Sequence, residues 1–251
     1  MDLILPQTTG SKAPRTTPRE RTLHLVEGTP TADGPGRPRS EALNRAVNVT
    51  LALTALIILA PVFLLIAFLV KFTSKGPVFY SQTRVGIDRR ATRTPAPSHR
   101  RIQDLGGHIF TIYKFRTMHV NAEHLSGVVW AAQEDPRVTT VGQLLRKYRL
   151  DELPQLLNVL VGDMNTVGPR PERPSIFMKL RKEISTYHYR QRAKPGITGL
   201  AQINQHYDVC LEDVRNKLRY DLEYLSRQGI IEDFKIMLKT VPVVLFKRGG
   251  W

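Results

Sequence analysis

The stretch Leu51–Val70, LALTALIILAPVFLLIAFLV, decides the fold class, because no residue from Ala46 to Val70 carries a charge. At about 1.5 Å of rise per residue, a helix of this length crosses a hydrocarbon core of about 30 Å. The sequence therefore predicts a membrane helix over residues 41–72.

The middle and the flanks of this segment restrict its topology. Pro61 removes a backbone hydrogen bond and bends a helix. Positive charge marks the cytoplasmic side of a membrane, and one spanning helix cannot place both of its ends there. A helix that enters, breaks at Ala60–Pro61 and returns satisfies both flanks, whereas an ordinary kinked transmembrane helix remains the alternative, since membrane helices tolerate proline. The basic flanking residues are Arg37, Arg39 and Arg45 before the segment and Lys71, Lys75, Arg84, Arg89 and Arg90 after it.

The polar remainder divides into a tail and a domain. Residues 1–40 are rich in Pro, Gly and Arg without apolar periodicity, which predicts a flexible tail. Residues 73–251 are predicted to form one domain on the cytoplasmic side. Within it, residues 88–107 hold five arginines, two prolines and a Gly-Gly pair, which is typical of a mobile insertion.

The domain is expected to be mainly α with a small β-hairpin. Residues 77–82 and 108–115 have the composition of two paired strands. Helical periodicity is found over residues 141–145 and 153–160, and again over residues 214–225 and 230–246. The last of these is amphipathic, so it either lies on the bilayer or packs on the core.

Charge and missing motifs narrow the function. Of the net charge of +15, residues 71–119 contribute +8, directly after the apolar segment, which favours anionic lipid or phosphate ligands over nucleic acid. Cys210 is the single cysteine, so an internal disulfide framework is excluded. The sequence has no dinucleotide-binding glycine motif, no P-loop and no zinc-protease motif.

Asp151 and Glu152 are the best candidates for chemistry. They precede Pro154 at the predicted start of the helix over residues 153–160, and a helix N-terminus attracts phosphate. Adjacent carboxylates on a helix point about 100° apart, so one can attack phosphorus while the other holds a divalent cation. The alternative is that Asp151 caps the helix and Glu152 complements its dipole.

Several cations accompany this pair in the sequence. Arg146 precedes it, Arg170 lies between two prolines, and Arg192 and Lys194 precede Pro195-Gly196. Together they could bind a pyrophosphate, although each alone could be an ordinary surface charge. Lys114 and Arg116 could join them, or could simply alternate on a strand with Phe115 inward.

At this point the sequence resembles the bacterial sugar transferases, the monotopic polyprenyl-phosphate phosphoglycosyl transferases, in a minimal catalytic-core form over residues 44–250. The matching blocks are Gln82-x-Arg84-Val85-Gly86, Lys114-Phe115-Arg116-Thr117-Met118, Asp135-Pro136-Arg137-Val138-Thr139 with Gly142, Leu150-Asp151-Glu152-Leu153-Pro154-Gln155-Leu156, Gly162-Asp163-Met164, Gly168-Pro169-Arg170-Pro171-Glu172 and Lys194-Pro195-Gly196-Ile197-Thr198-Gly199-Leu200-Ala201-Gln202.

The resemblance implies a re-entrant membrane helix, interfacial amphipathic helices and a catalytic domain on the cytoplasmic face of the bacterial inner membrane. It implies that Asp151 attacks the sugar-bearing phosphate of a UDP-sugar, expels UMP and passes the phosphosugar to undecaprenyl phosphate. Glu152 would be the Mg²⁺ ligand, with Arg146, Arg170 and Lys194 in the active site. The pathway would be that of an exopolysaccharide, capsule, O-antigen or glycoprotein glycan.

Two further expectations qualify this assignment. Many family members have Ser-Pro where this chain has Ala60–Pro61, so the re-entrant turn lacks one hydroxyl that could bond the freed carbonyls. A membrane-anchored basic adaptor that binds anionic lipid or nucleic acid without turnover is the alternative function. For the transferase, membrane lipids are expected partners, nucleic acid is not, and a homodimer stays open.

Overall fold

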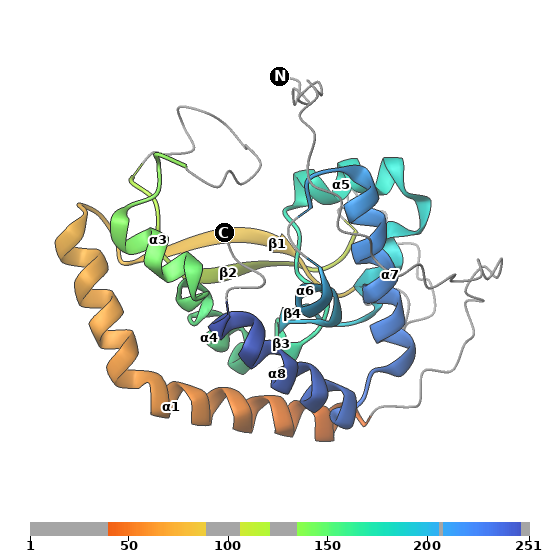
Figure 1. The fold of residues 1–251 in the computed structure, drawn as a ribbon. Helices are drawn as coiled ribbons and strands as arrows, with labels where there is room; N and C mark the ends of the chain where they lie inside the picture. Colours follow the sequence, from red (N-terminus) through yellow and green to blue (C-terminus); the bar gives the residue numbers. More distant parts are fainter. Residues whose placement is uncertain (1–39, 89–105, 121–134, 206–207, 247–251) are drawn as a thin grey trace. The chain divides into compact units, whose positions relative to one another are not determined.

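The computed structural model describes residues 40–88, 106–120, 135–205 and 208–246 (Figure 1). The predicted tail over residues 1–40 and the predicted insertion over residues 88–107 lie outside these ranges, apart from their end residues. In chain order the elements are α1 (Glu41–Thr73), β1 (Phe79–Val85), β2 (Ile109–Phe115), α3 (Thr140–Lys147), η2 (Leu150–Glu152), α4 (Gln155–Val161), β3 (Asn165–Val167), α5 (Pro174–Glu183), η3 (Ser185–Arg192), β4 (Gly196–Thr198), α6 (Leu200–Asn204), α7 (Leu211–Arg227) and α8 (Ile230–Leu245), where η marks a 3₁₀ helix.

These elements confirm the mainly helical class with a small hairpin. Strands β1 and β2 pair antiparallel, with Phe79 opposite Phe115 and Val85 opposite Ile109. On α4, the Asn158 side chain holds β2: its Nδ2 donates to the Thr111 carbonyl at 2.7 Å, and its Oδ1 accepts from the Tyr113 N–H at 3.2 Å. The hairpin therefore has one edge bound to a helix.

Helix α1 contains the whole uncharged stretch. Its N-cap is Ser40, whose hydroxyl accepts a hydrogen bond from the Leu43 N–H at 3.3 Å. Within the described ranges it is the one helix long and apolar enough to cross a membrane. Figure 1 shows that α1 changes direction along its length, and Pro61 accounts for the bend because it interrupts the backbone hydrogen-bond ladder.

Both halves of α1 pack against the rest of the described chain. In the first half, Ala52 is fully buried in a cluster with Ile112 of β2 and Val159 of α4. In the second half, Ile66 and Val70 are buried with Phe115 of β2 and Leu145 of α3. The two arms of the helix are thus attached to one folded unit on either side of Pro61.

Polar contacts fasten both ends of α1 as well. Near its start, the Arg45 guanidinium donates to the carbonyls of Val159 and Leu160 at the end of α4. One turn later, Oδ1 of Asn48 accepts from the Thr166 N–H of β3 at 2.6 Å. At the other end, Arg116 donates to the Ser74 carbonyl at 2.8 Å. Because these groups belong to the same unit, both ends of the apolar helix lie against it.

The small parallel pair formed by β3 and β4 was not predicted from the sequence. Asn165 pairs with Gly196, and Val167 pairs with Thr198. A Cβ added to Gly196 would lie 2.0 Å from the Gly168 N, and one added to Gly168 would lie 2.3 Å from the Lys194 carbonyl oxygen. The close approach of these two segments therefore requires glycine at both positions.

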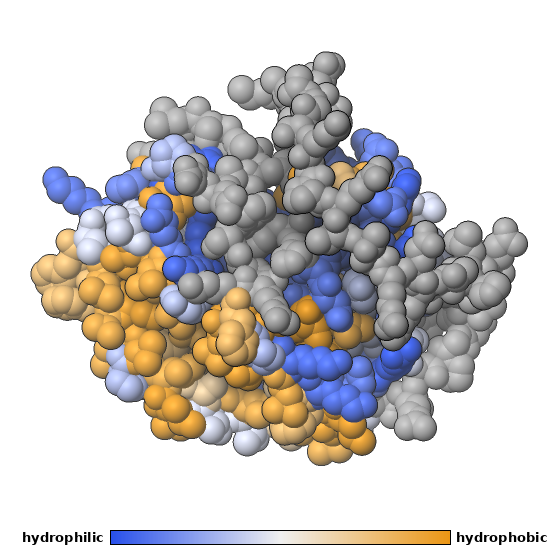
Figure 2. Space-filling view, in the orientation of Figure 1, coloured by the Kyte–Doolittle hydropathy of each residue, from blue (hydrophilic) through white to orange (hydrophobic). Residues whose placement is uncertain are grey.

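Helix α8 is amphipathic, as expected, and one of its faces packs on the core. Ile236 is buried with Val167 and Tyr224. The opposite face is apolar and exposed, and Figure 2 shows hydrophobic surface on the side of the unit formed by α1 and α8. The α8 side chains that are each more than half exposed are Ile231, Phe234, Leu238, Val241 and Leu245.

Candidate active site

Asp151 and Glu152 lie on η2, and α4 begins only at Gln155. This corrects the prediction that the pair occupies the start of the amphipathic helix, where free N–H groups would bind phosphate. The Glu152 N–H already donates to the Arg149 carbonyl, and the Leu153 N–H donates to the Leu150 carbonyl. Pro154, which lacks an N–H, separates this short turn from α4. Neither carboxylate caps α4, so the alternative reading of the pair as a cap fails as well.

Glu152 is clamped by cations. Its Oε1 lies 2.7 Å from Lys114 Nζ and 2.5 Å from Arg170 Nη2, while its Oε2 accepts from Arg170 Nη1 at 3.1 Å. Arg149 Nη1 lies 3.9 Å from Oε2. Burial disfavours the charged carboxylate, but Arg170 and Lys114 outweigh it and hold the pKa of Glu152 well below its usual range. Glu152 is therefore an ionised, fixed group.

Asp151 is buried like its neighbour but is held less closely, and its pKa shifts in the opposite direction. Its Oδ2 lies 3.8 Å from Lys114 Nζ, beyond hydrogen-bond distance. Burial raises the pKa of Asp151, and the adjacent Glu152 adds to this effect, whereas Lys114, Arg146 and Arg170 oppose it. The residue is 7% exposed. Asp151 is thus a buried carboxylate in a cationic environment, and within the described part of the chain no cation clamps it as closely as Glu152 is clamped; in its ionised form such a group can act as a nucleophile.

Arg146 reaches this pair from α3. Thr139 caps α3 by accepting a hydrogen bond from the Gly142 N–H at 2.9 Å. Gly142 allows α3 to approach the main chain that follows β2, because a Cβ there would lie 2.1 Å from the Thr117 carbonyl oxygen. The Arg146 Nε then donates to the Thr117 hydroxyl at 2.9 Å. The side chain is held in place, and its charge acts on Asp151.

Arg170 is positioned by a buried ion pair behind it. Arg190 is 1% exposed and donates to the Arg170 carbonyl at 2.9 Å through Nη2. The same guanidinium lies 2.7 Å from the buried carboxylate of Asp221 on α7. Pro169 and Pro171 restrict the backbone on either side. The segment that delivers Arg170 to Glu152 is consequently rigid.

Glu172 extends this network one residue further. Its carboxylate accepts from Lys217 Nζ at 2.9 Å and from Arg190 at 3.4 Å. Burial alone would raise the pKa of Glu172, but Lys217 and Arg190 lower it to about 2. Its main-chain carbonyl accepts from the Val85 N–H, which joins this network to the hairpin.

The remaining predicted cations have other locations. Arg116 lies at the end of α1, where its guanidinium donates to the Ser74 and Lys75 carbonyls. Arg192 is exposed and stacks over the Tyr189 ring at 4.5 Å. Lys194 is half-buried just before β4. The structure thus brings Lys114, Arg146 and Arg170 to the acidic pair, and the contacts described for Arg116 and Arg192 lie elsewhere.

Arg149 was missed by the sequence reasoning. It lies two residues before Asp151 and has a left-handed backbone with φ of 52°, which non-glycine residues rarely adopt. This conformation turns the chain from α3 into η2 and directs the guanidinium toward Glu152. The only available signal was one more arginine close to the pair.

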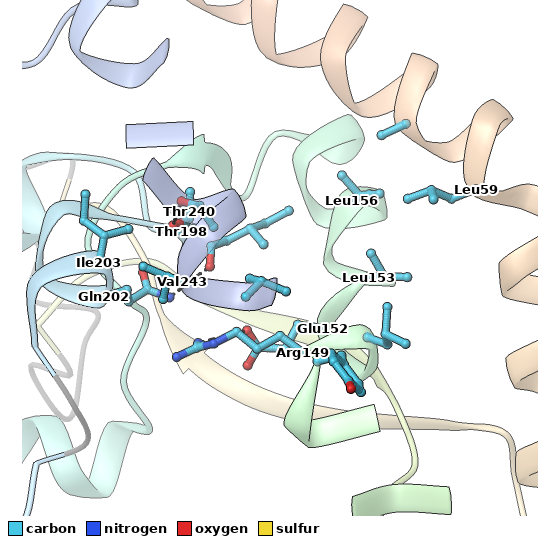
Figure 3. Close-up of a pocket in the computed structure, with 15 residues that line it drawn as sticks. Leu59, Arg149, Glu152, Leu153, Leu156, Thr198, Gln202, Ile203, Thr240 and Val243 are labelled. Carbon is cyan, nitrogen blue, oxygen red and sulfur yellow. Dashed lines mark hydrogen bonds and ion pairs between the residues drawn. The ribbon is translucent and has the colours of Figure 1, made fainter. Parts of the chain in front are cut away.

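A cavity of about 310 Å³ borders Glu152 of the acidic pair. Leu150 and Glu152, the neighbours of Asp151 in the chain, both line it. Figure 3 shows Leu59 of α1 on one side, Leu153 and Leu156 near the centre, and Thr240 and Val243 of α8 on the other. The remaining lining residues are Ala55, Tyr148, Arg149, Ile197, Thr198, Gln202, Ile203 and Val244.

The carboxylate oxygens of Asp151 and Glu152 could hold Mg²⁺ only together with ligands from outside the protein. Among the described residues, no group of three or more His, Cys, Asp or Glu side chains could hold a metal. Mg²⁺ is usually bound by one or two carboxylates together with substrate phosphates and water. Asp151 and Glu152 supply two adjacent carboxylates, so the residues fit that mode.

Comparison with known proteins shows a family match over most of the chain and relatives that are named as undecaprenyl-phosphate sugar transferases. The family model described as bacterial sugar transferase matches residues 39–247. A UDP-glucose:undecaprenyl-phosphate glucose-1-phosphate transferase of Escherichia coli (strain K12) is 39% identical over 221 residues, which are 87% of this chain and 44% of the relative. A UDP-N-acetylgalactosamine-undecaprenyl-phosphate N-acetylgalactosaminephosphotransferase of Aeromonas hydrophila is 37% identical over 203 residues, 81% of this chain and 44% of the relative.

A third relative is matched over almost its whole length. The exopolysaccharide production protein ExoY of Sinorhizobium fredii (strain NBRC 101917 / NGR234) is 34% identical over 236 residues, 88% of this chain and 94% of the relative. The chain thus spans less than half of the two transferases named above and nearly all of this shorter protein.

Proposed function

The chain belongs to the bacterial sugar transferase family, and on that premise we propose that it is a polyprenyl-phosphate phosphoglycosyl transferase. It moves a sugar-1-phosphate from a UDP-sugar to undecaprenyl phosphate and releases UMP. The product begins the lipid-linked assembly of an exopolysaccharide, capsule, O-antigen or glycoprotein glycan. The relatives named as UDP-sugar transferases and as an exopolysaccharide production protein support this substrate class.

The contrast between the two adjacent carboxylates is the observation that best supports the proposal. Glu152 is held by Lys114 and Arg170 in a bidentate clamp, which suits a group that stays ionised and organises charge. Asp151 is buried beside the same cations, and no described residue holds it as closely as Glu152 is held, which suits a nucleophile. A mere structural ion pair would not need a second buried carboxylate next to the first.

The first displacement uses Asp151. One of its carboxylate oxygens attacks the phosphorus that carries the sugar, and the bond from that phosphorus to the bridging oxygen breaks. The bridging oxygen leaves with UMP, and the phosphosugar remains as an ester of Asp151. Arg146, Arg170 and Lys114 neutralise the negative charge that the two anions bring together.

The second displacement regenerates the carboxylate. An oxygen of the lipid phosphate attacks the same phosphorus, the ester bond to Asp151 breaks, and the lipid diphosphate sugar leaves. Dividing the transfer into two steps keeps the two anionic substrates from having to react directly with each other.

We further propose that Mg²⁺ is required. Glu152 and the diphosphate of the UDP-sugar would hold the ion, with Asp151 adjacent. When bound, Mg²⁺ supplies neutralisation of the charge that develops on the departing phosphate. Glu152 already contacts two cationic side chains, so part of that clamp has to share its oxygens with the ion.

The membrane topology that we propose is re-entrant. Arg45 and Asn48 fasten the start of α1, and Arg116 fastens its end, to one unit. A straight membrane-spanning helix would place its ends on opposite sides of the bilayer, whereas contacts of both ends with one unit support their location on the same side. The basic flanks support the cytoplasmic side. The exposed apolar face of α8 then lies on the bilayer surface.

Isotope exchange tests the proposal most directly. The purified protein in detergent is incubated with a UDP-sugar, Mg²⁺ and labelled UMP in the absence of lipid, and a panel of UDP-sugars identifies the donor. Label should enter the UDP-sugar in the wild type and not in Asp151→Asn. The matched control is Glu212→Gln, an exposed carboxylate on α7 that should exchange normally. Full exchange by Asp151→Asn would exclude the covalent mechanism.

A further inference from the structure

The cavity beside the acidic pair has the polarity of an amphiphile. Of the described residues that line it, two carry a charge, Arg149 and Glu152. Most of the others are aliphatic, and they come from α1, α4, α6 and α8 and from η2, β4 and the turn before α4. The uncharged polar residues in the lining are Tyr148, Gln202, Thr198 of β4 and Thr240 of α8, and the hydroxyls of the two threonines bond each other at 2.8 Å. A ligand that fits has an apolar body and one polar end, and Arg149 is the group in the lining that would bind an anion.

The same two helices, α1 and α8, line the cavity and carry exposed apolar side chains on their outer faces. Ala55 and Leu59 belong to α1, and Val243 and Val244 belong to α8. The outer faces of these two helices carry the exposed apolar side chains, among them Ile58 and Val241. A hydrocarbon chain dissolved in the bilayer therefore meets the wall of the cavity at the helices that touch the lipid.

Arg149 lies at the charged end of this cavity. Its Nη1 is 3.9 Å from Glu152, farther than the 2.5 Å and 2.7 Å contacts that Arg170 and Lys114 make with the same carboxylate. Glu152 is thus clamped mainly by the other two cations. The left-handed backbone of Arg149 costs free energy, and such strain persists where a site requires a particular side-chain direction.

We propose that this cavity binds the first isoprene units of polyprenyl phosphate and that Arg149 binds the phosphate of this acceptor. The inference rests on the proposed function and specifies its second substrate site. The volume of about 310 Å³ is at the lower end of the range for small-molecule sites, so the rest of the chain stays in the bilayer. Glu152, the chain neighbour of Asp151, lines the same cavity, so the phosphate is bound at the acidic pair.

The two half-reactions separate this inference from the proposed function. Val243→Trp fills the cavity, and the KM for undecaprenyl phosphate should rise at least about tenfold. The lipid-independent exchange of UMP into the UDP-sugar should stay within about twofold of wild type. Val241→Trp places the same side chain on the exposed face of α8 and is the matched control, with KM unchanged.

Substitutions of Arg149 test the phosphate contact. Arg149→Asn removes the charge while tolerating the left-handed backbone, and the KM for the lipid should rise about tenfold or more. Arg149→Lys keeps the charge and should recover most of the affinity. An unchanged lipid KM in both Val243→Trp and Arg149→Asn would overturn the inference, whereas loss of exchange in the wild type would overturn the proposed function instead.

Photo-crosslinking tests the binding site in the wild-type protein, so its result does not depend on whether a variant folds. A diazirine-bearing isoprenoid phosphate is irradiated with the wild-type protein, and the labelled peptides are identified by mass spectrometry. Labelling should concentrate on α8 near Val243 and on α1 near Leu59, and undecaprenyl phosphate should compete. Competition by phosphatidic acid to the same extent would assign the cavity to membrane lipid, and labelling confined to the outer face of α8 would refute a binding site; either result overturns the inference.

Discussion

Removing Arg170 should expose how strongly the acidic pair depends on its cations. In Arg170→Met, Glu152 keeps Lys114 at 2.7 Å but loses both hydrogen bonds from the guanidinium. A charged hydrogen bond contributes about 1.5–3 kcal/mol, and breaking a fully buried pair costs about 3–5 kcal/mol. The Glu152 side chain is 8% exposed and Arg170 is 29% exposed. Because Lys114 remains, we expect the free energy of unfolding to fall by about 2 kcal/mol at pH 7.

The pH dependence of this loss has a definite sign. The folded pKa of Glu152 lies below its unfolded value of 4.5. The clamp therefore stabilises the protein fully above that value and loses its effect as the pH falls through the folded pKa. In Arg170→Met the folded pKa moves upward, so the stability difference between wild type and variant should narrow on acidification below about pH 4.5.

A double-mutant cycle with Glu152→Gln, measured by chemical unfolding in detergent, isolates the pair. The coupling free energy should be about 2 kcal/mol. Arg227→Met is the matched control, since it breaks an exposed pair with Glu223 and should cost less than about 1 kcal/mol. A coupling below about 0.5 kcal/mol between Arg170 and Glu152 would refute the view that the clamp fixes Glu152.

Two further results are expected. First, the rate of the lipid-independent exchange should rise with pH through the ionisation of Asp151, and its apparent pKa should lie above the ordinary aspartate value of 3.8 because burial raises it; an apparent pKa below 3.8 would contradict this. Second, in a Cys210→Ser background, cysteines introduced at Glu41, the first residue of α1, and at Lys75, just after its end, should both react with a membrane-impermeant maleimide from the same side of the inner membrane; labelling from opposite sides would contradict the re-entrant topology.

Much of the fold could be predicted because its signals are local. An uncharged apolar run specifies α1, and alternating strand residues specify the hairpin. The pair of β3 and β4 could not be predicted in the same way, because strands of three residues show no periodicity. Their pairing depends on the close approach of Gly168 and Gly196, which is a property of the assembled chain.

The candidate site likewise combines residues that the sequence predicts with residues whose placement depends on the folded chain. Asp151, Glu152 and Arg170 were predicted because a charged residue near prolines and other charges is visible in the sequence. The direction of the Arg149 side chain could not be predicted, since it depends on a left-handed backbone conformation between α3 and η2. Arg116 was ambiguous for a different reason: β2 ends at Phe115, so the next side chain no longer follows the alternation of the strand.

The end of β2 couples the membrane anchor to the chemistry. Lys114 contacts Glu152, Phe115 is buried against the second arm of α1, and Arg116 closes the last turn of that arm. In the re-entrant topology that we propose, these three consecutive residues set the depth of the carboxylates relative to the lipid headgroups. Exchanging the anchor for one of another length would shift the acidic pair vertically and separate it from a lipid phosphate, even with every active-site side chain intact.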